Sequence, residues 1–215
     1  MPAYQATHIP YGLTDPSKRV IVNPGIQDRV EFLKYGIETG GEYFFVRTLV
    51  KPGGGVPIHK HATYGETFYP VHGEIAVVGH NGTKTMMLSP ESNDPYVVKP
   101  GEWHRFFNPS ETEDIIFDAK LQPAHQEFEK VLFILYGLVD DGYGTPEGFP
   151  KSIFHQLMLS NMGEVAYPGF VGWATGLAAK IAGWIAKVTG EQERLTVKYY
   201  GRPITDGERM KWKLS

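Results

Sequence analysis

The chain has 215 residues, with 21 Lys and Arg against 24 Asp and Glu and a formal net charge of −3. This near balance argues against a nucleic-acid partner, and the length allows one domain with additions or two small domains. Because the chain has no cysteine, disulfides, thiolate metal sites and cysteine nucleophiles are excluded. Any metal ion must therefore be bound by nitrogen and oxygen atoms.

From the sequence we expect neither a secretory signal peptide nor a membrane-spanning helix. Its first residues, from Met1 to His8, lack the basic start and the apolar run of a signal peptide. The longest apolar stretch, residues 170–179, contains glycine and threonine and is followed by Lys180, so it falls short of the ~20 apolar residues of a spanning helix. We therefore expect a cytoplasmic protein with a small-molecule partner.

Residues 30–119 have the features of short β-strands, namely β-branched and aromatic runs separated by Gly, Pro and Asn. Asn81-Gly82 favours a type I′ turn and hence a β-hairpin. The predicted strands include residues 42–50, 67–71, 74–80, 83–88 and 112–119.

After Pro123 the apolar residues recur at spacings of three and four, which is typical of amphipathic helices. A further strand is predicted at residues 195–200. The predicted helices are residues 124–139, 152–162 and 170–188.

Many short strands followed by helices favour a mainly β fold, a small barrel or two-sheet sandwich, over alternating βαβ units. The predicted divisions are an N-terminal arm at 1–29, a β-barrel at 30–122, and a helical C-terminal extension with a tail at 123–215.

Three histidines and a glutamate are candidate metal ligands. Alternate side chains on a strand share a face, so His59 and His61 should project together, roughly 6–7 Å apart along the backbone. Gly65 permits a turn that brings Glu66 beside them, and His104 stands at a second entry from turn to strand. This set suits one divalent transition metal, Fe, Mn, Ni, Cu or Zn. An octahedral ion would keep two adjacent positions for water, substrate or dioxygen.

The spacing of these residues resembles the first cupin motif, G-x5-HxH-x4-E-x6-G. Every fixed position of that motif is matched, by Gly53, His59, His61, Glu66 and Gly73.

The second cupin motif is partly kept. Gly101, His104 and Asn108 match PGxxH-x3-N in spacing, whereas Lys99 stands where the family usually has proline and Asn93 where it usually has glycine. The resemblance implies a single-domain, metal-binding cupin of the quercetinase-like or secondary-metabolism type. Its fold would be a double-stranded β-helix, or jelly-roll, barrel with a helical C-terminal extension. The implied metal ligands are His59, His61, Glu66 and His104.

Two phenylalanines are candidate pocket residues. Strand alternation places Phe68 on the face of Glu66 and Phe106 on the face of His104. If both line the barrel, the pocket is apolar and suits an aromatic, polyketide-like or terpenoid ligand. The alternative is that both simply fill the core. Glu102 and Tyr69 are weaker candidates for acid–base groups.

The predicted helix at 170–188 carries an apolar stripe at near-heptad spacing, with Lys180 and Lys187 off the stripe. It could pack on the barrel, form a homodimer contact, close the barrel as a lid or lie on a membrane surface. The stripe consists of Phe170, Trp173, Leu177, Ile181, Trp184 and Val188.

Three hypotheses of function follow from the metal site and the resemblance. The leading one is a metal-dependent dioxygenase, with Fe(II) favoured, that acts on a small aromatic, enol, polyketide-like or terpenoid-like molecule. The second is a non-redox metal-dependent isomerase, cyclase or lyase of secondary metabolism, in which the ion acts as a Lewis acid. The third is a non-catalytic cupin that binds a small ligand.

Overall fold

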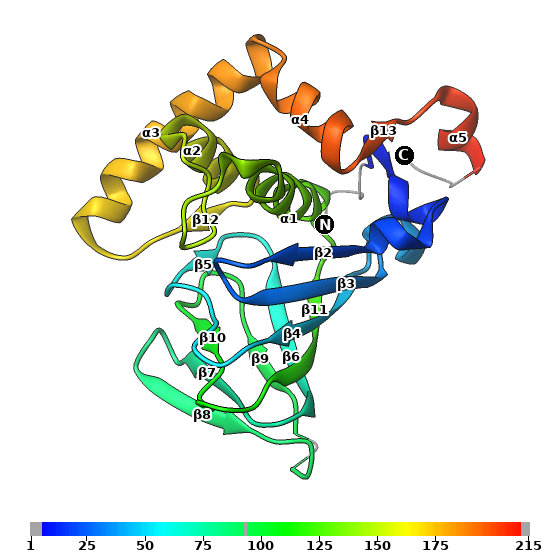
Figure 1. The fold of residues 1–215 in the computed structure, drawn as a ribbon. Coiled ribbons are helices and arrows are strands. Elements are labelled where there is room, and N and C mark those ends of the chain that lie inside the picture. Colours follow the sequence, from blue (N-terminus) through cyan, green and yellow to red (C-terminus); the bar gives the residue numbers. More distant parts are fainter. Residues whose placement is uncertain (1–5, 93, 212–215) are drawn as a thin grey trace.

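Two antiparallel sheets lie below a group of helices in the view of Figure 1. The computed structural model describes residues 6–92 and 94–211. Asn93, where the second cupin motif usually has glycine, and the first five residues of the chain lie outside that part.

The larger sheet has six strands in the order β2-β3-β4-β11-β6-β9, and the smaller has the order β10-β7-β8. Two further pairs are β1-β13 and β12-β5. The strands are β1 (His8–Pro10), β2 (Val20–Asn23), β3 (Asp28–Lys34), β4 (Phe44–Val50), β5 (Lys60–His61), β6 (Gly65–His72), β7 (Ile75–Gly79), β8 (Lys84–Leu88), β9 (Tyr96–Val98), β10 (Arg105–Phe107), β11 (Ile115–Gln122), β12 (Val165–Ala166) and β13 (Gly201–Pro203).

The helices follow β11, except for three short 3₁₀ turns. These turns are η1 (Tyr11–Leu13), η2 (Pro16–Arg19) and η3 (Gly36–Thr39). The α-helices are α1 (Gln126–Leu138), α2 (Ile153–Met162), α3 (Gly169–Val188), α4 (Glu191–Tyr199) and α5 (Asp206–Lys211), with a π-helical turn η4 (Val139–Tyr143) after α1.

Strand alternation gives the larger sheet one buried face. In β4 every second residue is buried, starting at Phe44, while Arg47 on the outer face pairs with Asp118 of β11 at 2.7 Å. β11 lies between β4 and β6, with Ala119 opposite both Val46 and Phe68. Apolar side chains at every second position of a strand therefore form the face of the sheet that is buried away from water.

The helical part of the chain shares this core with the strands. Phe32, Phe44 and Phe117 from the sheet belong to the same buried cluster as Phe133 and Tyr136 of α1. The ring centroids of Phe32 and Phe133 are 4.9 Å apart. Burial of such rings favours folding by about 2–3 kcal/mol each, so α1 is fixed on the sheet by the packing that also holds the sheet together.

Most of the predicted elements are present, with small shifts of their ends. The hairpin between β7 and β8 is confirmed, but its loop spans residues 80–83 and has positive φ at His80, Asn81 and Gly82. It is therefore longer than the two-residue type I′ turn that we predicted.

The predicted strand at 195–200 is wrong, because that segment belongs to helix α4. Its β-branched and aromatic residues suggested a strand. However, Glu191 and Glu193 occupy the first turn and Lys198 the last, which complements the helix dipole. Leu195 and Tyr199, four residues apart, turn one side of the helix toward the α1–α2 core.

The predicted divisions of the chain stay a prediction. β2 falls inside the predicted arm yet pairs with β3 in the larger sheet, so the sheet begins before residue 30. The strands form separate sheets, and a closed barrel likewise stays a prediction.

The apolar stripe of α3 is largely open to solvent. Leu177, Ile181, Trp184 and Val188 are 58%, 53%, 67% and 65% exposed, whereas the side chains of Phe170 and Trp173 lie outside the described residues. Among the helices that the structure describes, none is long and apolar enough to cross a membrane. The homodimer contact through this helix stays a prediction.

Asp28 should make the stability of the fold depend on pH. Its carboxyl is buried and accepts a hydrogen bond from the Tyr136 hydroxyl at 2.5 Å, and burial raises its pKa from 3.8 to about 7. Since the folded-state pKa is the higher one, the carboxyl stabilises the fold below about pH 4 and loses that contribution as the pH rises through 7.

We therefore expect Asp28→Asn to flatten the pH profile of the free energy of unfolding. Relative to this variant, the wild type should lose about 4 kcal/mol between pH 4 and pH 8. Urea denaturation at pH 4, 6 and 8 measures the difference. The exposed control Asp114→Asn should leave the profile unchanged, and parallel profiles for wild type and Asp28→Asn would contradict the expectation.

Candidate metal centre

The four predicted ligands come together in one cluster. His59, His61, Glu66 and His104 each offer a ligand atom, and these atoms all lie within 4.8 Å of one another. His61, Glu66 and His104 are buried, and His59 is half-buried. The structure thus brings together residues from both cupin motifs of the sequence.

Backbone pairing between the two motif segments sets the spacing of the ligands. The amide of His59 donates to the carbonyl of His104 at 2.9 Å, and the amide of His104 donates back at 2.8 Å. Their ring centroids lie 4.5 Å apart. Glu66, the second residue of β6, reaches the same point, with its carboxylate oxygens 3.3 and 3.5 Å from the Nε2 atoms of His61 and His104.

The other motif positions shape the turns around the ligands. Gly53, Gly73 and Gly101 have φ values of 77°, 69° and 81°, which residues with a Cβ rarely adopt. Asn108 is buried and its side-chain amide donates to the carbonyls of Val50 and Glu113 at 2.9 and 2.8 Å. These residues hold the chain in place and do not bind a metal themselves.

Each imidazole is oriented through its Nδ1 atom. Nδ1 lies 2.8 Å from the Pro57 carbonyl in His59 and 2.9 Å from the Glu102 carbonyl in His104. A carbonyl can only accept, so both Nδ1 atoms carry a hydrogen, and in the neutral form of each ring Nε2 carries a lone pair. In His61 the Nδ1 partner is the Tyr64 hydroxyl, at 2.6 Å.

The Nε2 atoms of His61 and His104 are buried and have no hydrogen-bond partner among the described residues. A buried polar atom without a partner costs about 1–3 kcal/mol. A divalent ion at this point would satisfy both atoms and would also accept His59 and the Glu66 carboxylate as ligands. Three imidazoles and one carboxylate therefore fit such an ion.

The electrostatics of the cluster give Glu66 and His59 the protonation states that bind metal. Burial, together with the neighbouring His61 and His104, lowers the pKa of His59 to about 3. Burial alone would raise the pKa of Glu66, but its contacts with His104 and His61 lower it well below its usual range. Burial would likewise lower the pKa of His104, but Glu66 outweighs it and raises that pKa. At neutral pH the cluster therefore contains a carboxylate and a neutral His59.

A cavity of about 400 Å³ opens beside the centre, and His59 and His61 form part of its wall. The rest of the wall comes mainly from α1, α2 and the segments next to β5 and β12, and most of it is apolar. Its apolar side chains include Val56, Leu132, Leu135, Phe149, Leu159 and Val165. The metal cluster therefore faces a space that is bordered in part by the helical part of the chain.

Phe68 and Phe106 lie elsewhere in the core. Phe68 is fully buried, its ring centroid lies 5.9 Å from that of half-buried Phe106, and both rings contact Phe117. Neither is among the described residues that line the cavity. Their role as substrate-pocket residues stays a prediction.

Glu102 and Tyr69, the weaker acid–base candidates, have other contacts. The Glu102 carboxylate accepts from the amides of His80 and Lys99 at 2.7 and 3.1 Å, which anchors the turn before His104. The Tyr69 ring packs edge-on against Phe45.

The sequence reasoning missed Tyr64 and the wall formed by the helices. The spacing of Phe128, Leu132 and Leu135 identified an apolar face on α1, but no local signal showed that part of this face borders the metal cluster. For Tyr64, the only sequence signal is its position between His61 and Glu66.

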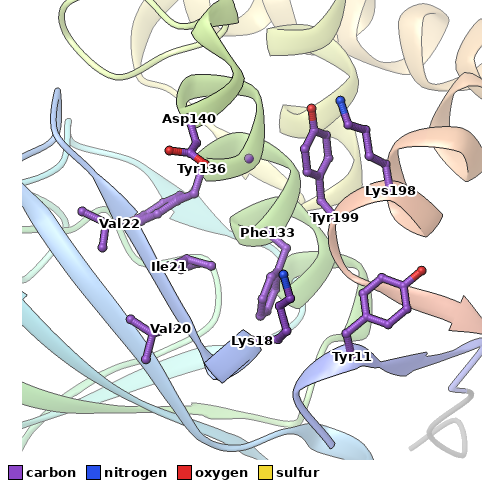
Figure 2. Close-up of a pocket in the computed structure, with 11 residues that line it drawn as sticks. Tyr11, Lys18, Val20, Ile21, Val22, Phe133, Tyr136, Asp140, Lys198 and Tyr199 are labelled. Atoms are coloured by element: carbon purple, nitrogen blue, oxygen red, sulfur yellow. The ribbon is translucent and has the colours of Figure 1, made fainter. Parts of the chain in front are cut away.

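A larger surface pocket, of about 560 Å³, lies apart from the metal cluster (Figure 2). Side chains of β2, α1 and α4 surround it, and none of the four ligands lines it. Lys198 on its rim is paired with Asp141, and the Tyr11 hydroxyl donates to the Val197 carbonyl. The metal cluster is therefore the candidate functional site.

Part of the chain is similar to known proteins. Residues 46–118 match the family described as Cupin domain. Among solved structures, the polyketide cyclase RemF from Streptomyces resistomycificus is 18% identical with a TM-score of 0.39, covering 45% of this chain and 65% of that chain. A cupin 2 domain-containing protein from Halorhodospira halophila is 19% identical with a TM-score of 0.39, covering 45% and 64%.

An RmlC-like cupin from Shewanella frigidimarina NCIMB 400 is 22% identical with a TM-score of 0.43, covering 58% of this chain and 97% of that chain. The matches to the first two structures span less than two thirds of those chains. No curated protein matches the sequence.

Glu66→Ala should weaken metal binding without unfolding the protein, because one ligand is lost while the apolar core remains. Changes to groups that merely orient a ligand cost about 10–100-fold in affinity, so we expect a loss of about 100-fold or more. Metal content after dialysis and the far-UV circular dichroism spectrum measure the two effects. Glu74→Ala, at an exposed position, is the control that keeps its metal. An unfolded Glu66→Ala protein, or one with full metal content, would contradict this prediction.

Proposed function

We propose that the chain, whose residues 46–118 match the Cupin domain family, is a metal-dependent enzyme, a dioxygenase acting on a small and largely apolar organic molecule. The observation that carries the proposal is the shared wall between the ligand set and the cavity. His59 and His61 belong both to the metal cluster and to the cavity lining. A molecule bound in the cavity would therefore lie directly against the centre.

A divalent ion held by the four ligands would supply open coordination positions for a substrate oxygen and for dioxygen. The protein's part is to hold the ligands and exclude water. His61 and His104 are almost fully buried, and the apolar side chains of α1 and α2 keep the adjoining space poor in polar groups.

The lining favours redox chemistry over proton transfer. Among the described residues that line the cavity there is no carboxylate and no amine, and beside the two histidines the ionisable groups are Tyr136 and Tyr167. Burial raises the pKa of Tyr167, and burial with the nearby Asp28 raises the pKa of Tyr136 well above its usual value. Both phenols stay protonated at neutral pH and are poor bases. A redox-active ion such as Fe(II) therefore suits this site better than Zn.

The cavity favours a substrate that is mainly hydrocarbon. Its volume lies within the range of small-molecule sites. Two of its polar side chains already have partners, since Gln156 donates to the Pro150 carbonyl and Ser160 to the Val165 carbonyl. An aromatic, enol, polyketide-like or terpenoid-like molecule, with one oxygen directed to the metal centre, suits these walls.

The position of Tyr167 in the cavity lining supports the second candidate, a non-redox isomerase, cyclase or lyase. Its protonated hydroxyl is in the lining and could donate a proton to a substrate whose enolate the ion stabilises. This version shares every metal ligand with the dioxygenase.

Oxygen dependence separates the candidates. Protein purified without added metal is analysed for bound metals and then tested with a panel of phenols and enols in an oxygen electrode. We expect oxygen uptake that matches substrate loss, is abolished by His59→Ala and survives in His72→Ala, whose histidine is exposed at the end of β6. Turnover without oxygen would favour the second candidate. Ligand binding without turnover would favour a binding protein, and absence of bound metal would overturn both enzymatic versions.

Filling the cavity should impair substrate binding without affecting the metal. Leu132 is half-buried on α1 and lines the cavity, so Leu132→Trp should raise KM or abolish turnover while metal content stays at the wild-type level. Ile153→Trp is the matched control, because Ile153 is 71% exposed on α2 and is not among the lining residues. Unchanged kinetics in Leu132→Trp would contradict the assignment of the cavity as the substrate site.

A further inference from the structure

Tyr64 lies between the metal cluster and the segment that joins α2 to α3. Its side chain is buried, and its ring stacks on His61 with centroids 4.4 Å apart. The Tyr64 oxygen lies 2.6 Å from Nδ1 of His61, and its hydroxyl donates to the carbonyl of Gly163 at 2.8 Å. A ligand of the metal cluster is thus connected to the helical part of the chain through one hydroxyl group.

The same segment also pairs with the strand that carries His61. Val165 and Ala166 form β12, which runs antiparallel to β5 with Val165 opposite His61 and Ala166 opposite Lys60. Residues 163–166 therefore contact the ligand strand through both the backbone and Tyr64.

Glu164 makes further contacts that hold residues 163–166 in place. It has a left-handed φ of 54°, an uncommon conformation for a residue with a side chain. Its carboxylate accepts from the Thr63 hydroxyl at 2.7 Å and lies 3.5 Å from Nε2 of His125. Since Nδ1 of His125 accepts from the Phe128 amide at 3.1 Å, the hydrogen of a neutral His125 is on Nε2 and faces Glu164.

We infer that Tyr64 is a positioning residue that makes metal binding and the docking of residues 163–166 on β5 stabilise each other; this inference rests on the proposed metal centre. A hydroxyl has one hydrogen. While it is donated to Gly163, the Tyr64 oxygen can only accept from Nδ1–H of His61, which leaves the Nε2 lone pair free to bind metal. If the segment leaves β5, the hydroxyl can donate to Nδ1 instead, which selects the tautomer with a hydrogen on Nε2. That tautomer cannot bind metal through Nε2.

The coupling reaches the cavity wall. Val165 and Tyr167, in and next to the docked segment, line the cavity, as does Ser160 at the end of α2. Because coupling between two binding events is reciprocal, docking of the segment increases metal affinity, and metal binding in turn holds this part of the wall in place.

The first test compares Co²⁺ binding by wild type and two tyrosine variants. Tyr64→Phe removes the tautomer selection and should raise the Kd for Co²⁺ by about 10–100-fold. Tyr200→Phe is the matched control, since the Tyr200 hydroxyl is equally buried, donates to Glu129 at 2.5 Å and accepts from Gln126 at 3.3 Å away from the ligands. It should leave the Kd at the wild-type value. Calorimetry and the visible spectrum of bound Co²⁺ report affinity and ligand geometry without any assay of activity.

The second test measures the docking of the segment. In wild type, Co²⁺ should slow amide hydrogen exchange in residues 163–167, and in Tyr64→Phe this protection should be lost even at saturating Co²⁺. Glu164→Ala, at a half-buried position, removes the contacts with Thr63 and His125 but leaves the core intact, and it should raise the Kd in the same direction.

Several outcomes would overturn the inference. An unchanged Kd in Tyr64→Phe and Glu164→Ala, or an equal loss in Tyr200→Phe, would overturn it while leaving the metal centre intact. Amide hydrogen exchange in residues 163–167 that does not change when Co²⁺ is added would also overturn the inference and leave the metal centre intact. A wild-type protein that binds no Co²⁺ would overturn the proposed function together with the inference.

Discussion

The metal centre depends on one pair of backbone hydrogen bonds, those between His59 and His104. These residues are far apart in the sequence, and their mutual amide–carbonyl bonds fix the two motif segments in register. A shift by one residue would turn one of the imidazoles to the other face. The positions of His61 and Glu66 follow from this register, because His61 lies two residues along the same segment and Glu66 is the second residue of β6, the next strand along the chain.

The Nδ1 atoms of the three histidines need hydrogen-bond partners. Only two of the three find backbone partners within the motif segments. Pro57 and Glu102 supply the Nδ1 partners of His59 and His104 from backbone only two residues away in sequence. His61 differs, because its partner Tyr64 depends on the Gly163 carbonyl beyond α2. Two ligands are therefore oriented by the motif segments alone, and the third is oriented by the helical part of the chain.

The sequence was sufficient to predict what depends on local pattern. Strand alternation predicted β4, β6, β7, β8 and β11, and the motif spacing predicted the four residues that come together in the candidate metal cluster, since both are properties of neighbouring residues. The segment 195–200 was mispredicted because β-branched and aromatic residues also suit a helix that buries Leu195. The role of Tyr64 and the cavity wall could not be predicted, because each depends on where α1 and α2 pack against strands distant in sequence.

The strand segments and the helical part of the chain have different roles at this site. β5, β6 and the bridged pair His59 and His104 supply the candidate ligands, whereas α1 and α2 supply about half of the apolar side chains in the wall that a substrate would contact. An apolar wall beside a charged centre lowers the local dielectric, which strengthens the interaction between ion and ligands and disfavours free water. Substitutions on α1 and α2 can therefore change the substrate that fits while the ligand geometry persists. The segment at 163–166 is the exception, because it lies against both the wall and His61, and a change there should affect substrate fit and metal affinity together.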